Sequence, residues 1–182
     1  MKSVLISIRP EWCEKIANGK KYIEVRKTKP KLETPFKVYI YCTVGGIKKM
    51  PMDYLAEPFE RGKVIGEYVC DVIYMSFTGY RNGMPGYWDL LDGSCLTADE
   101  LMDYGRWETL YGWHISNLVI YNEPKELSEF YKVCPSYGAD FGVCWECENA
   151  VGEEFDCSVN GRIYLSRPPQ SWCYVEEGAD NG

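Results

Sequence analysis

Residues 6–27 read ISIRPEWCEKIANGKKYIEVRK and hold the clearest secondary-structure signals in the chain. Apolar residues alternate with smaller or polar ones over residues 3–8, which predicts a strand. Pro10 then opens a helix at a position where its missing N–H costs nothing. Gly19 ends that helix, and a second strand is predicted over residues 21–26. The segment therefore predicts a strand, a short helix and a strand in close succession.

The segment GKKYIEVR, residues 19–26, is the strongest candidate for a functional centre. Strand periodicity puts Glu24 and Arg26 on the face opposite Ile23, and Lys21 lies where the strand begins. A Lys can bind phosphate or act as a nucleophile or base, a Glu can orient it or relay protons, and an Arg can clamp an anion. The alternative is an exposed salt-bridge face on an ordinary strand, which would contribute only about 0–1 kcal/mol.

The composition indicates a soluble globular protein. With 182 residues and 46% hydrophobic content, the chain is long enough to form a single domain over residues 1–182 without disulfides. Its longest uncharged apolar run is far short of a membrane span, and Met1-Lys2 leads into an apolar run too short for a signal peptide. We therefore expect a cytoplasmic protein with no membrane association.

The remaining patterns predict short strands with few helices between them. Further strands are predicted over residues 37–43, 63–74, 113–121, 163–166 and 171–175. Residues Thr97-Ala98-Asp99-Glu100 form a capping box that starts a helix near 98–104, and residues 79–95 are expected to be a loop. Many short strands and two or three short helices predict an α+β fold with a small mixed β-barrel.

Charge is distributed unevenly along the chain. Residues 1–50 carry 12 Lys or Arg and 4 Glu, a net charge of +8, whereas residues 51–182 carry 8 Lys or Arg and 23 Asp or Glu, a net charge of −15. A basic surface on an acidic body suits an anionic partner. The alternative is that Lys27, Lys29 and Lys31 form a solvated loop.

The segment 6–27 resembles the N-terminal signature of the ASCH family, which belongs to the PUA-like superfamily. The shared features are a strand, a short helix led by Pro, and the motif G-x-K-x-x-E-x-R, here Gly19, Lys21, Glu24 and Arg26.

Three later segments extend the resemblance. They are KVIGEYVCDVI at residues 63–73, GWHISNLVIYNEPKELSEF at residues 112–130, and the closing SRPPQSWCYVEE at residues 166–177. The last resembles the ending of ASCH proteins encoded in bacterial and prophage genomes.

The resemblance implies a PUA-like β-barrel with a cleft beside the first helix that binds RNA or a nucleoside. Arg9, Lys21 and Arg26 would contact phosphates or base edges, and Glu24 would accept a base amino group. The resemblance leaves the oligomeric state open.

Some ASCH relatives instead hydrolyse the acyl amide of acetylcytidine with a Lys, a Thr three residues later and a distant carboxylate. Here Lys21 matches the Lys, but Glu24 occupies the Thr position, which disfavours hydrolysis. In such an amidohydrolase Lys21 would be the base or nucleophile, with Glu24 or Glu67 assisting. Glu67 shares an apolar strand face with Ile65, so it needs a partner such as Lys21 or Arg26, unless a bulge turns it outward.

A Cys-rich insertion is predicted over residues 134–157. Cys134, Cys144, Cys147 and Cys157 have the spacing C-x9-C-x2-C-x9-C. Four thiolates make a closed structural zinc site, and such a site can fold a segment with little core of its own. Four free thiols or a redox pair are the alternatives. A third function is therefore a zinc-stabilised protein-interaction or regulatory protein.

The remaining candidates for functional residues are the single His and several aromatic residues in or near loops. One His excludes a site with several His ligands, and His114 is interpreted as a structural residue on a strand. The aromatic residues in or near loops could stack on bases or form a satellite core, and they are Tyr80, Tyr87, Trp88 and Trp107.

Overall fold

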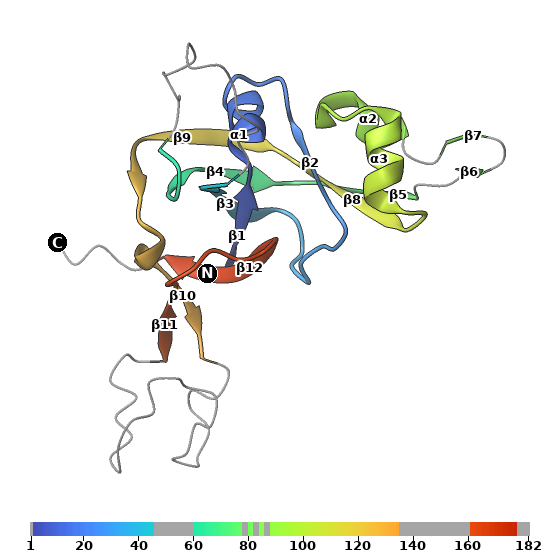
Figure 1. Cartoon of the computed structure of the whole chain (residues 1–182). Coiled ribbons are helices and arrows are strands. Elements are labelled where there is room, and N and C mark those ends of the chain that lie inside the picture. Colours follow the sequence, from blue (N-terminus) through green and yellow to red (C-terminus); the bar gives the residue numbers. More distant parts are fainter. Residues whose placement is uncertain are drawn as a thin grey trace, which may run out of the picture.

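The computed structural model describes residues 2–45, 60–77, 80–81, 84–85, 88–134 and 161–177 (Figure 1). The strands are β1 (Ser3–Ile8), β2 (Ile23–Arg26), β3 (Phe36–Cys42), β4 (Val64–Cys70), β5 (Ile73–Phe77), β6 (Tyr80–Arg81), β7 (Met84–Pro85), β8 (Thr109–His114), β9 (Ser116–Lys125), β10 (Phe130–Val133), β11 (Arg162–Tyr164) and β12 (Trp172–Glu177). The helices are α1 (Pro10–Ala17), α2 (Trp88–Ser94), α3 (Ala98–Gly105) and the 3-10 turn η1 (Leu127–Glu129). The α+β prediction is confirmed.

The strands form two main sheets. The larger has the order β11-β10-β12-β1-β3-β4-β9, and the smaller has the order β2-β8-β5. β1 and β3 are parallel, whereas the other ladders of these sheets are antiparallel. Among the described elements the chain passes between these two sheets four times, from β1 to β2, from β2 to β3, from β4 to β5 and from β8 to β9. The last two connections lie close together, since His114 N donates to Val72 O at 3.0 Å.

The predicted β-barrel is not confirmed. In the described residues the larger sheet ends at β11 and β9 and the smaller at β2 and β5, so the ladders stay open. β1 and β2 are separated by α1 and share no ladder in the described part of the chain. A side chain bridges them instead, because Arg26 Nη2 donates to Ser7 O at 2.7 Å.

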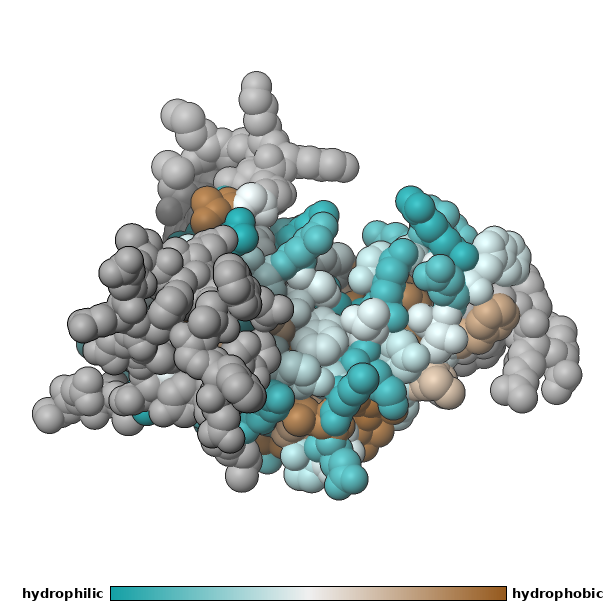
Figure 2. All heavy atoms as spheres, turned by 90° about the horizontal axis from the view of Figure 1, so that it is seen from below, coloured by the Kyte–Doolittle hydropathy of each residue, from teal (hydrophilic) through white to brown (hydrophobic). Residues whose placement is uncertain are grey.

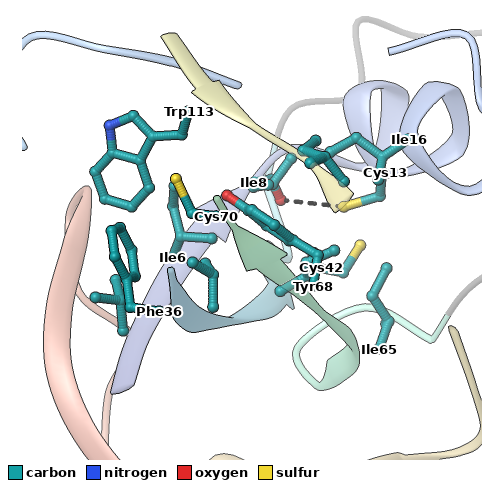
Figure 3. Packing of buried hydrophobic residues seen from close by; sticks show 14 residues of the cluster. Ile6, Ile8, Cys13, Ile16, Phe36, Cys42, Ile65, Tyr68, Cys70 and Trp113 are labelled. Atoms are coloured by element: carbon teal, nitrogen blue, oxygen red, sulfur yellow. Dashed lines mark hydrogen bonds between the residues drawn. The ribbon is translucent and has the colours of Figure 1, made fainter. Parts of the chain in front are cut away.

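Three apolar clusters hold the layers together. In the largest, α1 packs on one face of the larger sheet, and Figure 3 shows Cys13 and Ile16 pointing toward the strand residues around Tyr68. At its other end Trp113 of the smaller sheet packs edge-on against Phe36, with ring centroids 5.9 Å apart. A second cluster lies between the smaller sheet and helices α2 and α3. The third contains residues from the larger sheet together with Leu127 of η1.

Several predicted elements are divided by breaks in the sheets. The strand expected over residues 63–74 is split into β4 and β5, since Asp71 and Val72 lie at the crossing. The strand expected over residues 113–121 is likewise split at Ile115, whose N–H bonds to Tyr22 O at 2.9 Å. Residues 79–95 contain α2, so the prediction of a loop there is wrong in part.

The helix predicted from the capping box is confirmed. In α3 the Thr97 side chain accepts from Glu100 N at 3.2 Å, and Glu100 Oε2 accepts from Thr97 N at 2.8 Å. These bonds satisfy two orphan donors at the start of the helix. No helix in the described ranges has the length and apolar character needed to cross a membrane.

Candidate functional site

A pocket of about 450 Å³ lies at the junction of α1, β2 and α3. This volume falls in the range of roughly 300–1,000 Å³ that is typical of small-molecule sites. Its lining includes all four residues predicted to bind ligand, which are Arg9, Lys21, Glu24 and Arg26. The rest of the lining consists of Ser7, Ile8, Trp12, Val25, Thr43, Gly45, Leu96, Glu100, Tyr104 and Gln170.

Local structure explains how the motif reaches the pocket. Arg9 is the N-cap of α1, so its backbone is extended and the helix begins at Pro10. Gly19 has φ of 74°, a left-handed conformation that glycine adopts at little cost, and the chain reverses there. Lys21 N then donates to Lys15 O at 2.9 Å, which places Lys21 at the end of the helix.

Strand pairing turns the charged residues inward. β2 is antiparallel to β8, with Glu24 opposite Trp113. Ile23 and Val25 pack in the cluster beneath α2 and α3, as the period-2 pattern predicts. Glu24 and Arg26 therefore face the pocket from the other side of the strand.

Lys21 is buried and held from three sides. Its side chain is 3% exposed, and Nζ donates to Ile23 O and to Ser94 O, both at 2.8 Å. Glu24 Oε2 lies 3.3 Å from the same nitrogen. Two carbonyl oxygens thus accept hydrogen bonds from Lys21, and a carboxylate oxygen lies at ion-pair distance, so the side chain is held in the wall of the pocket.

Glu24 joins Lys21 to Arg26. Its residue exposure is 5%, and its Oε1 lies 3.1 Å from Arg26 Nη2. The Lys21–Glu24 contact has ion-pair distance without hydrogen-bond geometry, because Glu24 Oε2 has no hydrogen-bond partner among the described residues. Arg26 Nε is buried and lacks such a partner as well. The alternative of an exposed salt-bridge face is therefore wrong.

Two aromatic rings that the sequence interpretation did not assign to a site line the pocket. Trp12 of α1 lies under Lys15 Nζ and Lys21 Nζ, 4.4 and 5.2 Å from its ring centroid. Tyr104 of α3 is 38% exposed and lies 5.1 Å from Lys27 Nζ. Tyr104 follows Glu100 by four residues, so helical periodicity puts both on one face, and this signal was available in the sequence.

Of the four aromatic residues that could stack on bases or form a satellite core, Trp107 alone has a side chain among the described residues. Trp107 is 64% exposed and is absent from the lining. The side chains of Trp88 and Tyr80, and the whole of Tyr87, lie outside the described residues.

Comparison of the sequence with family models and with curated proteins finds no match. Comparison of the structure with solved structures finds similar proteins. An ASCH protein from Zymomonas mobilis superposes with a TM-score of 0.56 over 96% of this chain and 87% of that chain, at 18% sequence identity. The chain has the ASCH fold. Two single-residue mutants of that protein give TM-scores of 0.57 and 0.56, at 18% and 17% identity over 97% and 96% of this chain and 91% and 88% of theirs.

Within this ASCH fold, Glu67 lies apart from the pocket. Its Oε1 accepts from Lys37 Nζ at 2.8 Å, and its Oε2 accepts from Tyr121 Oη at 2.5 Å. The expected pairing with Lys21 or Arg26 is therefore wrong. Irregular register on both sides of Glu67 in the β4–β9 ladder accounts for the difference, since bulges turn the side chain to the opposite face.

His114 forms a second polar group of the ASCH fold. Its Nδ1 lies 2.7 Å from Asp71 Oδ1. This hydrogen bond holds the pKa of Asp71 below its usual value. Tyr22 and Tyr74 contact the imidazole edge-on, at centroid distances of 6.3 and 6.4 Å. Neither His114 nor Asp71 lines the pocket, in agreement with a structural role for the His.

The Cys-rich segment is attached to the ASCH fold at a strand pair. β10 and β11 are antiparallel, and Cys134 N donates to Gly161 O at 2.7 Å. Cys144, Cys147 and Cys157 lie outside the described residues. The described part of the chain contains no cluster of three or more metal-ligating side chains. The four-Cys zinc site stays a prediction.

Proposed function

We propose that the pocket binds a nucleoside, either free or as one residue of an RNA strand. The observation that carries this proposal is the convergence of a buried Lys21–Glu24–Arg26 triad and two aromatic rings on one cavity. Single-stranded RNA is recognised by stacking bases on aromatic side chains and by hydrogen bonds to their edges. Both kinds of group are present here on rigid elements.

Each group suits a different part of a nucleotide. Trp12 and Tyr104 offer ring faces for a base, and such stacking is worth about 1–3 kcal/mol per base. Glu24 can accept from a base amino group, and the sequence predicted this role. Arg9 is exposed at the pocket and suits a phosphate or ribose oxygen.

Binding of nucleosides, nucleotides and short RNAs, followed by thermal shift and tryptophan fluorescence, tests the proposal. Tyr104→Leu should weaken binding by about 5- to 150-fold, which is the stacking energy converted at 1.4 kcal/mol per tenfold. Tyr164→Leu is a matched control, because Tyr164 on β11 has a similar exposure of 41% and does not line the pocket. If none of these ligands binds the wild type at millimolar concentration, the proposal fails.

An amidohydrolase acting on an acylated cytidine is the second candidate. It would need Lys21 Nζ to reach a substrate, yet this nitrogen is directed at two carbonyl oxygens and Glu24. Glu67, the assisting carboxylate of that hypothesis, is outside the lining. We therefore rank recognition above catalysis. Release of a carboxylate from acetylcytidine that is abolished by Lys21→Ala would reverse this order.

A zinc-stabilised interaction protein is the third candidate, and it rests on the four cysteines. Elemental analysis of protein purified without chelator should give about one zinc per chain if Cys134, Cys144, Cys147 and Cys157 form one site. A ratio near zero removes the metal and, with it, the reason for this function.

A further inference from the structure

Lysines and aromatic rings alternate along one side of the molecule, beginning at the pocket. The loop after β2 carries Lys27, Lys29 and Lys31, all exposed. We propose that these three lysines form a phosphate track that guides a single RNA strand into the pocket. This inference rests on the proposed function, because it assigns a path to the nucleotides that flank the bound one.

The track starts at the wall of the pocket. Arg26 lines the cavity and Lys27 follows it directly in the chain. Lys27 Nζ lies 5.1 Å from the ring of Tyr104, which lines the same cavity. A strand whose base stacks on Tyr104 would therefore bring its neighbouring phosphate to Lys27.

The middle of the track is fixed against two strands. Lys29 Nζ lies 5.9 Å from the ring centroid of Tyr111 on β8. Thr28 Oγ1 accepts from Trp172 Nε1 of β12 at 3.0 Å. Because Pro30 is buried, the loop is anchored at that residue as well. The lysines are thus exposed on a loop that is anchored to the sheets at the residues between them.

The far end follows β12. Lys31 N donates to Tyr174 Oη at 2.7 Å, and Lys2 Nζ lies 4.8 Å from the Tyr174 ring. Trp172 and Tyr174 contact edge-on, with centroids 5.4 Å apart. Gln170, two residues before Trp172, lines the pocket, so the loop and β12 run together from the pocket to Lys2.

The charge of this loop favours a polyanion as its partner. Residues 27–31 contain no acidic residue, whereas the whole chain has a net charge of −7. An anionic strand is attracted to the track and repelled by the acidic remainder. Figure 2 shows the molecule from below relative to Figure 1, and on the part of this face that is not grey, hydrophilic side chains stand beside paler and hydrophobic ones. An acidic polypeptide would satisfy the lysines but has no base for the pocket, so RNA is the better fit.

The experiment compares the salt dependence of binding for a labelled RNA decamer, measured by fluorescence anisotropy. Each phosphate contact on a single strand adds about 0.7 to the slope of log affinity against log salt, so removing three should lower the slope by about 2. Between 50 and 200 mM salt the wild type should therefore lose about 18-fold more affinity than the triple variant K27Q/K29Q/K31Q.

A charge-matched control is K63Q/K125Q/K132Q, whose lysines take no part in the track. It should keep the wild-type slope, and both triple variants should bind a free nucleoside as the wild type does. Equal slopes for the two triple variants, or RNA that binds no tighter than a nucleoside, would overturn the track and leave the pocket proposal intact. Displacement of RNA by polyglutamate as effective as by unlabelled RNA would overturn it in favour of an acidic polypeptide. If the wild type binds neither nucleoside nor RNA, both proposals fail.

Discussion

Replacing Glu24 by Gln should strongly destabilise the protein, because Glu24 is the only acidic group in contact with Lys21 and Arg26 among the described ion pairs. Lys21 is 3% exposed and Glu24 is 5% exposed, so their charges are largely removed from water. Deleting one partner of a buried pair typically costs about 3–5 kcal/mol, since the other charge stays buried and uncompensated.

The structure sets the expected value at the lower end of this range. Lys21 keeps two carbonyl acceptors and Arg26 keeps Ser7 O, so some compensation remains. We expect a loss of about 3 kcal/mol. For a domain of this size that corresponds to a decrease in Tm of about 6–12 °C.

Urea unfolding and calorimetry of the Glu24→Gln protein measure this effect. Glu14→Gln is the control, because Glu14 is exposed on α1 and a substitution there should change the free energy of unfolding by less than about 0.5 kcal/mol. The double variant Lys21→Met, Glu24→Gln should be more stable than Glu24→Gln alone, since it removes the uncompensated ammonium. A Glu24→Gln protein within about 0.5 kcal/mol of the wild type would refute the electrostatic account of the triad.

Three further substitutions probe other parts of the fold. Burial of Glu67 raises its pKa, but the hydrogen bonds to its carboxylate more than offset this and the pKa is lowered. A lowered pKa in the folded state contributes stability above the unfolded value of about 4.3 that is lost as the pH falls. Glu67→Gln should therefore cost about 1 kcal/mol at pH 7 and much less at pH 3, as measured by urea unfolding. Gly66→Ala should cost about 1–3 kcal/mol in the same assay, because a Cβ there would lie 2.4 Å from Val119 O. Thr97→Ala should cost about 1 kcal/mol, and it should weaken nucleoside binding because α3 carries Tyr104.

Each of these has its own control. Gly45→Ala should leave stability unchanged, since a Cβ at Gly45 meets nothing within 4 Å. Thr97→Ser retains a capping hydroxyl and should retain the stability of α3. A cost of Glu67→Gln that is the same at pH 3 and pH 7 would contradict the linkage argument.

The parts of the site that depend on signals within a few residues could be predicted from the sequence. The 2-residue period of β2 correctly separated Glu24 and Arg26 from Ile23, and Gly19 correctly marked the reversal that places Lys21. The four predicted ligand-binding residues line one pocket because they lie on or beside the consecutive elements α1 and β2. Between neighbouring elements, local geometry determines which side chains lie close together.

What the sequence determined by itself is the succession β1–α1–β2 and the start of α3, since a strand period, an N-terminal Pro, a Gly and a capping box act within a few residues. What only the tertiary structure decided is the burial of the triad, the partners of Glu67, and the walls that Trp12 and Tyr104 add to the pocket. These depend on which faces of distant elements meet. Periodicity assigns each residue a face, whereas the breaks between β4 and β5 and between β8 and β9 determine where that face lies in space.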